Sequence, residues 1–463
     1  MNLTQKIAAY IGSFSHNPIN PMIEKQAKQH FIDTFACIVC GSAEPSALWI
    51  RNYIAGMSAS HGSRILFDEN LQVNPAAAAL YYGFCAHNCD ADDLSKNLAG
   101  HPSAVVLPVI LALGTMRDSS GIQCLRAYIA GVETASAIGK GFLGGCFSTG
   151  WNQTTVLGIF GAVAAASVLM GLSEEEIVAA LGIAASEASG LKVNYGSSAK
   201  DVSVGNASAK AIFAAELAKD GIRANPDSLG AASGLFRTLA PSANLDAIND
   251  ALTHGDSDFL YPGIILKPYP ACRGIHNGID GALALRAQYA ISPEEIQTVT
   301  CLVQDTVIES NRYPIPNKPT EAKFSLGYCI ALALLHGAVT AADFSDSVSL
   351  EPAALKLAER VKIQVDNAFT SDNAKSGIEV IILTRGGQEF RHRGQFAKGD
   401  PNNPMMPEEH RTKLIQCLSR RMSIEYIDAL LDRMTTLEKT TICKIYDLCN
   451  SCAPAQTIEM QEL

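Results

Sequence analysis

The chain has 463 residues, 48% of them hydrophobic and 18% charged, and its formal net charge is −10. This balance is that of a folded globular protein and excludes intrinsic disorder. The length favours two domains over one. The acidic balance argues against nucleic-acid binding, which needs clustered Lys and Arg, but a few basic residues in one cleft can still bind an acidic small molecule.

The N-terminal twenty residues lack the apolar run and the small-residue cleavage site of a secretory signal, so we expect a cytoplasmic protein. Thirteen cysteines are an odd number, which predicts free thiols rather than a disulfide framework. The groups at residues 85–89 and at Cys443, Cys449 and Cys452 lack the paired C-x-x-C pattern of structural zinc. We therefore predict no metal site.

The first 260 residues are Ala-rich, and their apolar residues recur at helical spacing, which predicts a bundle of helices. Ser173 followed by Glu176 predicts a capping box at the start of one helix. The uncharged stretch at 151–172 is long enough to span a bilayer. Because it opens with polar residues and is crowded with Gly and Ala, we interpret it as a buried core helix and predict no membrane partner.

The pattern changes near Tyr261. Strands are predicted at residues 296–304, 361–365, 378–384 and 388–393, with a hairpin turn at Gly386-Gly387, and helices at 320–336 and 351–360. After Lys398 the chain becomes helical again. We predict a mainly α fold, in which residues 1–265 plus 400–463 form a large all-helical domain and residues 266–399 form a smaller inserted α+β domain.

The first candidate catalytic residues lie in a polar segment before a long apolar stretch. His101 stands in GHPSAVVLPVILAL, with Asp90, Asp92 and Asp93 just upstream. Histidine has the side-chain pKa nearest neutrality, which suits proton transfer. At helical spacing Asp90 and Asp93 share one face. A solvated acidic helix end remains the alternative interpretation; on the functional one, His101 and Asp90 are catalytic and Asp93 binds substrate.

Two further segments supply cations. Lys200 lies in SSAKDVSVGNASAKA, where a Ser-rich loop enters a helix and leaves backbone N–H groups free for an anion. Lys267, Arg273 and His276 lie in KPYPACRGIH, at the junction of the helical and mixed segments. Two cations and a histidine there suit a polyanionic substrate. Each segment also has an interpretation without function. Lys200 can be read as an exposed surface lysine, and the segment with Lys267 as a plain linker.

Taken together, these segments resemble the MmgE/PrpD family. The blocks that carry the resemblance occur in the expected order and cover most of the chain: GHPSAVVLPVILAL with the preceding D-x-D-D, GWNQTTVLGIFGAVAAASVLMGL, SSAKDVSVGNASAKA, KPYPACRGIH, EAKFSLGYCIALAL and FAKGDPNNPMM.

The resemblance implies a helical domain made from both chain ends, an α+β lid domain, a homodimer, and no metal or organic cofactor. It also implies small di- or tricarboxylate substrates bound in a pocket between the domains. By position, Asp90, His101, Lys200 and Lys267 match pocket residues of the family, and Tyr313 matches a pocket tyrosine.

Two positions depart from the family pattern. Asn152 stands where the family commonly has histidine, and Leu94 stands where it has Thr or Tyr. An asparagine can hydrogen-bond a carboxylate but cannot exchange a proton near pH 7. We therefore predict that Asn152 binds and orients substrate.

The resemblance therefore implies a lyase that moves a proton next to a carboxylate, similar to 2-methylcitrate dehydratase. His101 is the expected acid/base, oriented by Asp90, while Lys200, Lys267 and Arg273 hold the substrate carboxylates. Three alternatives stay open: a lyase resembling cis-aconitate decarboxylase, an epimerase or isomerase of a dicarboxylate, and a carboxylate-binding protein whose catalysis has decayed.

Overall fold

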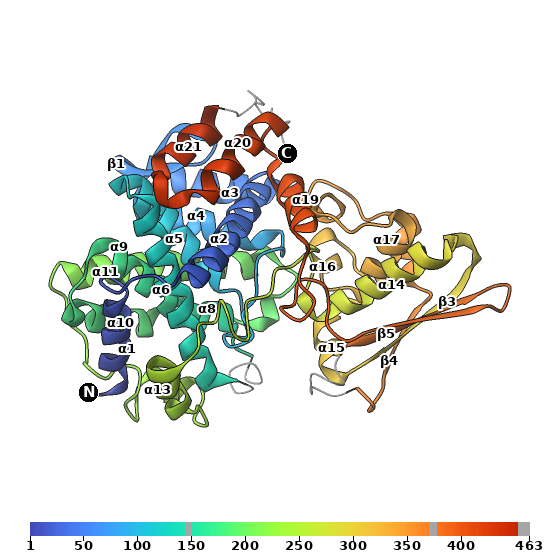
Figure 1. Ribbon diagram of the computed structural model, residues 1–463, viewed down its shortest axis with the longest axis horizontal. Helices are drawn as coiled ribbons and strands as arrows, with labels where there is room; N and C mark the ends of the chain where they lie inside the picture. The colour runs from blue at the N-terminus through green and yellow to red at the C-terminus, as the bar shows by residue number, and fades with distance from the viewer. Residues whose placement is uncertain (144–149, 370–376, 452–463) are drawn as a thin grey trace.

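The protein is built around two hydrophobic cores (Figure 1). The computed structural model describes residues 1–143, 150–369 and 377–451. The first core draws on residues between Leu3 and Ile264 and again between Leu414 and Cys449, and the second on residues between Ala271 and Ile382. The mainly α fold is confirmed, and both ends of the chain contribute to the first core. The domain boundaries given above stay predictions.

The first core is enclosed by helices whose lengths follow the apolar periodicity of the sequence. They are α1 (Leu3–Ser13), α2 (Pro21–Ser42), α3 (Pro45–Ala55), α4 (Pro75–Asn88), α5 (Pro102–Arg117), α6 (Gly121–Gly139), α8 (Gln153–Val156), α9 (Gly158–Met170), α10 (Glu174–Glu187), α11 (Ser198–Lys219), α12 (Leu235–Leu239), α13 (Leu245–His254), α19 (Pro407–Leu418), α20 (Ile424–Thr435) and α21 (Ile442–Ser451), with short 3-10 turns at Lys140–Phe142, Lys192–Asn194 and Leu437–Lys439.

Two local predictions for this region are confirmed. Ser173 and Glu176 form a capping box that opens α10, because each side chain accepts a hydrogen bond from the other residue's backbone N–H. The stretch Gln153–Met170 is long and apolar enough to cross a membrane, yet 89% of it is buried inside the protein. It is therefore a core element, in agreement with its small-residue composition.

The expectation of an all-helical first domain is wrong in one place. Strands β1 (Ser58–Ile65) and β2 (Asp68–Val73) pair antiparallel between α3 and α4. The connecting Phe67 has a φ of 62°, and Gly62 lies against the backbone of Val73. The hairpin's irregular register hides the period-2 pattern that identifies most strands.

The second core lies beneath a four-stranded sheet of order β4-β3-β5-β6, in which only β3 and β4 are parallel. Figure 1 shows this part projecting to the right of the helices. Its elements are α14 (His276–Tyr289), β3 (Ile296–Val303), α15 (Asp305–Ser310), α16 (Pro319–Ala322), α17 (Leu326–His336), α18 (Pro352–Ala358), β4 (Val361–Val365), β5 (Ile378–Thr384) and β6 (Glu389–Gly394), with 3-10 turns at Arg273–Ile275, Pro293–Glu295 and Ala341–Phe344. The predicted strands and the hairpin turn at Gly386-Gly387 are confirmed.

The single helix predicted at 320–336 is instead two helices, because the chain breaks at residues 323–325. Ser325 caps α17 by accepting a hydrogen bond from the backbone N–H of Tyr328 at 3.2 Å. The break turns Lys323 toward the first core, where its Nζ donates to the backbone oxygen of Asn88 at 2.5 Å. A continuous helix would not make this contact between the two parts.

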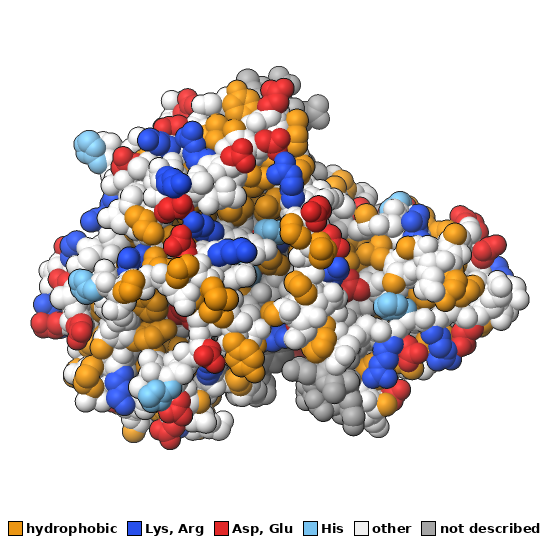
Figure 2. All heavy atoms as spheres, in the orientation of Figure 1, with side chains coloured by type: hydrophobic (Ala, Val, Ile, Leu, Met, Phe, Trp, Pro, Cys, Tyr) orange, Lys and Arg blue, Asp and Glu red, His pale blue; other side chains and the backbone are white. Residues whose placement is uncertain are grey.

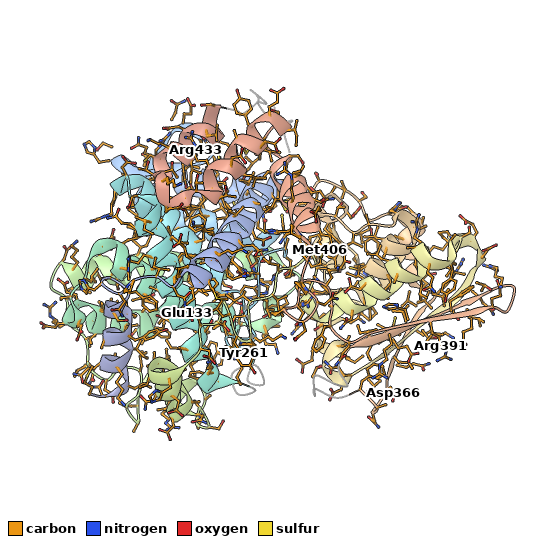
Figure 3. The ribbon with its side chains drawn as sticks, in the orientation of Figure 1. Glu133, Tyr261, Asp366, Arg391, Met406 and Arg433 are labelled. Atoms are coloured by element: carbon orange, nitrogen blue, oxygen red, sulfur yellow. The ribbon has the colours of Figure 1, made fainter. Side chains whose placement is uncertain are left out.

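The surface gives further support to the charge argument. Figure 2 shows Lys and Arg side chains interspersed with Asp and Glu over the face in view, without one broad basic patch. Arg433 and Met406 lie on the helical part and Asp366 and Arg391 on the α+β part (Figure 3). The face in view therefore lacks the stripe of cations that nucleic-acid binding requires.

Helices α4 and α11 approach unusually closely, and glycine makes this possible. A Cβ on Gly205 of α11 would lie 2.1 Å from the backbone oxygen of Leu80 in α4, and one on Gly83 would lie 2.6 Å from the Cα of Gly205. The crossing brings the start of α11, with Lys200, beside the end of α4, with Asn88. Much of the site described below depends on it.

Replacing Gly205 with Ala should lower the free energy of unfolding by about 1–3 kcal/mol, because the new methyl group overpacks the α4–α11 contact. Urea unfolding followed by circular dichroism measures the change. Gly12→Ala is the matched control, since its Cβ would meet nothing closer than Glu174 Cγ at 3.7 Å. Equal midpoints for the two variants would contradict the proposed role of the crossing.

Candidate active site

The three aspartates after α4 lie in a turn and have three different sets of partners. Asp90 has a φ of 55°, in the left-handed region that few non-glycine residues adopt. The expectation that Asp90 and Asp93 share a helix face is therefore wrong. Asp90 and Asp92 face two different clusters of ionisable groups, and Asp93 faces the interior of the helical bundle.

Asp90 forms a buried ion-pair cluster with two lysines from distant parts of the chain. Lys267 Nζ donates to Asp90 Oδ1 at 2.6 Å and Lys200 Nζ lies 3.5 Å from Oδ2. The Lys267 side chain is 0% exposed. Burial alone would raise the pKa of Asp90, but the two ammonium groups outweigh it and hold that pKa well below its usual range. Asp90 is thus an anion that positions two cations.

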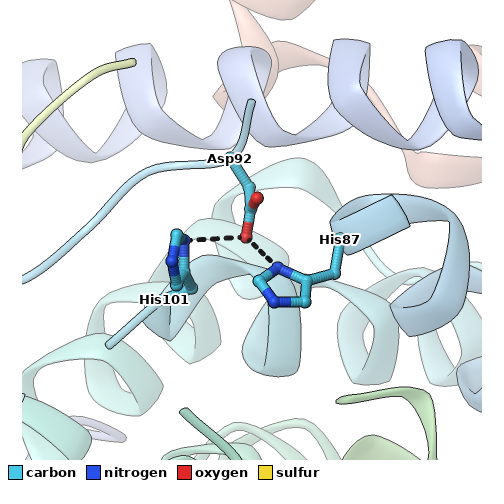
Figure 4. Close-up of side chains that lie close together, drawn as sticks. All are labelled: His87, Asp92 and His101. Atoms are coloured by element: carbon cyan, nitrogen blue, oxygen red, sulfur yellow. Dashed lines mark hydrogen bonds and ion pairs between the residues drawn. The ribbon is translucent and has the colours of Figure 1, made fainter. Parts of the chain in front are cut away.

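Asp92 holds two histidines at once (Figure 4). His87 Nδ1 lies 2.8 Å and His101 Nδ1 3.1 Å from the same oxygen, Asp92 Oδ2, and the two rings meet edge to face at 4.8 Å. Burial would raise the pKa of Asp92, but the two imidazoles keep it well below its usual range. An ionised carboxylate only accepts, so the hydrogen bond of His87 places the proton of that ring on Nδ1. His101 Nδ1 faces the same oxygen at ion-pair distance.

His101 is therefore oriented by Asp92, and the expectation that Asp90 would do so is wrong. Its ring is 14% exposed, and its backbone N–H donates to Thr154 Oγ1 at 3.1 Å. His87, considered above only as part of the 85–89 group and rejected there as a metal ligand, is almost fully buried, and burial lowers its pKa to about 4. Its Nε2 has no hydrogen-bond partner among the described residues. The one feature of the sequence that could have predicted the contact between His87 and Asp92 is that they stand five residues apart.

Asp93 and the junction residues lie outside this cluster. Asp93 accepts from His30 Nδ1 at 2.9 Å and from Ser103 Oγ at 2.6 Å. Arg273 donates to the backbone oxygens of Lys398 and Ala397, and His276 Nε2 lies 3.0 Å from the backbone oxygen of Ala271. Among the described residues no hydrogen bond or ion pair joins them to the Asp90 or Asp92 clusters, although the charges of Lys267 and Asp90 act on the pKa of His276. The structure thus separates them from His101 and Lys200.

Asn152 and Tyr313 fix the loop that leads into α11. Tyr195 Oη donates to Asn152 Oδ1 at 3.4 Å, and Tyr313 Oη donates to the backbone oxygen of Tyr195 at 2.9 Å. The next residue, Gly196, has a φ of +85°, and the Tyr313 ring lies where its Cβ would be. Lys200 Nζ then lies 5.7 Å from the centre of the Tyr195 ring.

A small cavity, with about 10 Å³ open to the centre of a water molecule, lies where these elements meet. Its lining includes Asn88, Asp90, Ser197, Lys200, Asp201 and Lys323. Asp201 and Lys323 were not predicted as site residues, although both stand inside motifs quoted above. Asp201 directly follows the matching Lys200, and Lys323 lies in a segment whose pattern predicts only a helix. The volume is below the 300–1,000 Å³ usual for ligand pockets. A substrate therefore has to part the two cores or displace a side chain.

Metal binding has one candidate place among the described residues. The donor atoms of His87, Asp92 and His101 lie within 4.8 Å of one another. Both imidazole Nδ1 atoms face one carboxylate oxygen at hydrogen-bond or ion-pair distance, so a cation would have to replace those protons. Lys200, which acts on the pKa of both Asp90 and His87, would repel it. We favour the hydrogen-bonded arrangement. Of the cysteines considered above, Cys452 lies outside the described residues, while Cys89 Sγ lies 3.4 Å from Cys40 Sγ.

Comparison with known proteins agrees with this geometry. Residues 5–247 match the MmgE/PrpD N-terminal domain and residues 269–438 match the MmgE/PrpD C-terminal domain. The chain belongs to the MmgE/PrpD family. Three of the sequence blocks that resemble this family supply the residues of one cluster. They contain Asp90, Lys200 and Lys267, which lie together in the structure.

The curated relatives include cis-aconitate decarboxylases and 2-methylcitrate dehydratases. The cis-aconitate decarboxylases of Mus musculus and Homo sapiens are 25% and 24% identical to this chain, over 96% of it and 92% and 93% of their own lengths. The 2-methylcitrate dehydratase of Salmonella typhimurium is 22% identical over 90% of this chain and 91% of its own. All three alignments span at least 90% of each protein.

The depressed pKa of His87 should appear in the pH dependence of stability. Burial lowers the pKa of His87 to about 4, below its ordinary 6.5, so the folded state resists protonation. The stability it contributes is present above pH 6.5 and is lost as the pH falls to 4, by up to about 3 kcal/mol. His87→Asn, which can still donate to Asp92, should flatten this slope in urea unfolding. His336→Asn, at an exposed pair with Glu351, is the control. An unchanged slope in His87→Asn would contradict the assignment.

Proposed function

We propose that this protein is a lyase that acts on a small di- or tricarboxylate, and that its first candidate reaction is dehydration of a hydroxy acid such as 2-methylcitrate. The observation that carries the proposal is the pairing of His101 with the buried carboxylate of Asp92, beside the Lys200–Asp90–Lys267 cluster. An acid/base group thus lies next to cations that suit carboxylates. The names of the relatives give further support.

The proposed chemistry begins at the carbon next to a substrate carboxylate. With its Nδ1 proton directed to Asp92, a neutral His101 presents the lone pair of Nε2, which takes the proton from that carbon. The electron pair left behind spreads onto the carboxylate, and Lys200 and Lys267 stabilise the negative charge that develops there. Asn152 orients and does not exchange protons.

The group that holds the substrate carboxylates differs from the sequence expectation. Arg273 donates to the backbone oxygens of residues 397–398 and does not line the cavity, so we propose Lys323 for this role. Lys323 lines the cavity, and a substrate carboxylate would compete with the backbone oxygen of Asn88 for it. Lys200 and Lys267 are paired with Asp90 in the structure, so an incoming carboxylate competes with Asp90 for them. Substrate binding then opens the cavity and rearranges the cluster in one step.

Decarboxylation is the second candidate, because the cis-aconitate decarboxylases align over nearly the whole chain. In that reaction the C–C bond to one carboxylate breaks and CO₂ leaves. A protonated His101 then donates a proton to the carbon that carried that carboxylate. The same lysines would hold the remaining carboxylates. The two reactions differ in whether the first proton moves to or from His101.

Three further parts of the proposal rest on the family resemblance: a homodimer, catalysis without metal or organic cofactor, and a cytoplasmic location. Large apolar side chains on α3, Trp49 and Tyr53, are 68% and 60% exposed and suit burial against a second copy. The site's own histidine and lysines supply both proton transfer and positive charge, which supports catalysis without a cofactor.

Replacing His101 with Gln should reduce turnover by about 10²–10⁴-fold, because the group that moves the proton is removed. Proton NMR in D₂O with 2-methylcitrate, citrate, cis-aconitate and iminodisuccinate measures alkene formation, CO₂ loss and exchange at the carbon next to the carboxylate. The exposed His336→Gln is the control. Near-normal turnover in His101→Gln would show that another group moves the proton.

Extended dialysis against EDTA should leave the rate of turnover unchanged, since no step of the proposed chemistry passes through a metal ion. The rate is measured before dialysis, after it, and after adding back Zn²⁺ or Mg²⁺. A lost activity that a divalent cation restores would contradict the proposal and direct attention to His87, Asp92 and His101.

A further inference from the structure

The carboxyl group of Asp201 lines the cavity without a bonding partner. The residue is 8% exposed and stands in the first turn of α11, next to Lys200. Among the residues that the structure describes, its side chain makes no hydrogen bond or ion pair. A buried polar group without a partner is rare in a folded protein, and one that faces a cavity suggests a ligand.

The charged groups around Asp201 come from two other segments as well as its own helix. Lys200 precedes it on α11, Lys323 follows α16, and Asp90 and Asp92 lie in the turn after α4. Both lysines are engaged elsewhere: Lys200 with Asp90 at 3.5 Å and Lys323 with the backbone oxygen of Asn88 at 2.5 Å. Neither is left to neutralise Asp201 by direct contact.

This environment separates Asp201 from the other carboxylates of the site. Burial raises the pKa of Asp201 to about 7, against the pull of Lys200 and Lys323, whereas the cations that touch Asp90 keep the pKa of Asp90 well below its usual range. Carboxyl groups whose pKa values are driven apart in one site commonly divide the roles of acid and base. Burial also raises the pKa of Glu133 to about 7, but Glu133 accepts hydrogen bonds from Ser257 and from the backbone N–H of Asp258, away from the cavity.

We propose that Asp201 is the acid that protonates the departing hydroxyl group of a hydroxycarboxylate substrate. The inference rests on the proposed function and makes it specific for substrates whose hydroxyl lies one carbon beyond the carbon that loses its proton. His101 breaks the C–H bond and takes that proton, and the electron pair of the bond becomes the new C=C bond. The C–O bond breaks, and the hydroxide leaves as water with the proton of Asp201. Both groups then exchange protons with solvent, His101 losing one and Asp201 gaining one.

The division of roles also accounts for Asn152. The asparagine cannot exchange a proton near pH 7, so the elimination needs a second acid/base group besides His101. Asp201 lies in the cavity with Lys200 and Lys323, which can hold the carboxylates on either side of the leaving group. Water lost in the reaction would then form beside a carboxylate that accepts hydrogen bonds from it.

The test compares Asp201→Asn with the intact protein on two substrates in D₂O. One is 2-methylcitrate or citrate, and the other is the same acid with fluorine in place of the hydroxyl, because fluoride leaves without being protonated. Asp201→Asn should dehydrate the hydroxy acid about 10²-fold more slowly or worse. It should still exchange deuterium at the carbon next to the carboxylate and eliminate fluoride at a rate near that of the intact protein. Asp220→Asn, at the far end of the same helix, is the matched control.

Each result decides the question. Equal dehydration rates in Asp201→Asn and the intact protein would overturn the role of Asp201 and leave the proposed function standing. An equal loss on the hydroxy and fluoro acids would show a structural role and also overturn it. No exchange and no elimination by the intact protein would overturn the proposed function, and this inference with it.

A second measurement needs no variant and so does not depend on folding. In the intact protein the rate of dehydration should fall as the pH rises through about 7, because Asp201 loses its proton, whereas the rate of fluoride elimination should not fall. Two profiles of the same shape would overturn the assignment of Asp201.

Discussion

The ion pair between Asp90 and Lys267 links the two halves of the protein at the point where its chemistry is proposed to occur. Asp90 lies in the turn after α4 in the helical part. Lys267 lies where the chain passes from that part to the second core. Such a pair is costly to bury and worse to break, since either partner alone would be a buried, uncompensated charge. The pair therefore constrains how the parts meet more than it adds to stability.

The same constraint explains why neighbouring carboxylates behave differently. Asp90 and Asp92 are kept ionised by cations and imidazoles within 3.5 Å, whereas Asp201, in the same cavity as Asp90, has no such contact. Each environment depends on what lies against the carboxylate. Lys267 lies against Asp90, His101 at the start of α5 lies against Asp92, and Asp201 faces the cavity. The turn after α4 thus supplies one carboxylate that positions lysines and one that positions histidines, and the start of α11 supplies a third that neither lysines nor histidines contact directly.

Close backbone packing makes this arrangement possible. Gly83 and Gly205 allow α4 and α11 to touch, which places the ends of the two helices, with His87 and Lys200, on one side of the crossing. The break before α17 then directs Lys323 across the gap to Asn88. The segment around α16 contributes Thr320, Lys323 and Phe324 to the lining of the cavity. With these side chains in place, the cavity is smaller than a typical ligand site.

The sequence by itself determined the mainly α class, the strands of the second core, the capping of α10 and the family, because these depend on periodicity, turn residues and motif order within short segments. It also singled out Asp90, His101, Lys200 and Lys267, which the structure brings close together around the turn after α4. Only the tertiary structure decided that Asp92 rather than Asp90 orients His101, that Arg273 and His276 brace a turn, and that Asp201 and Lys323 face the cavity. Residues such as Lys323 and Asn88 are 235 positions apart. Which side chain meets which at that separation depends on how helices pack and where they break, and local patterns do not carry that information.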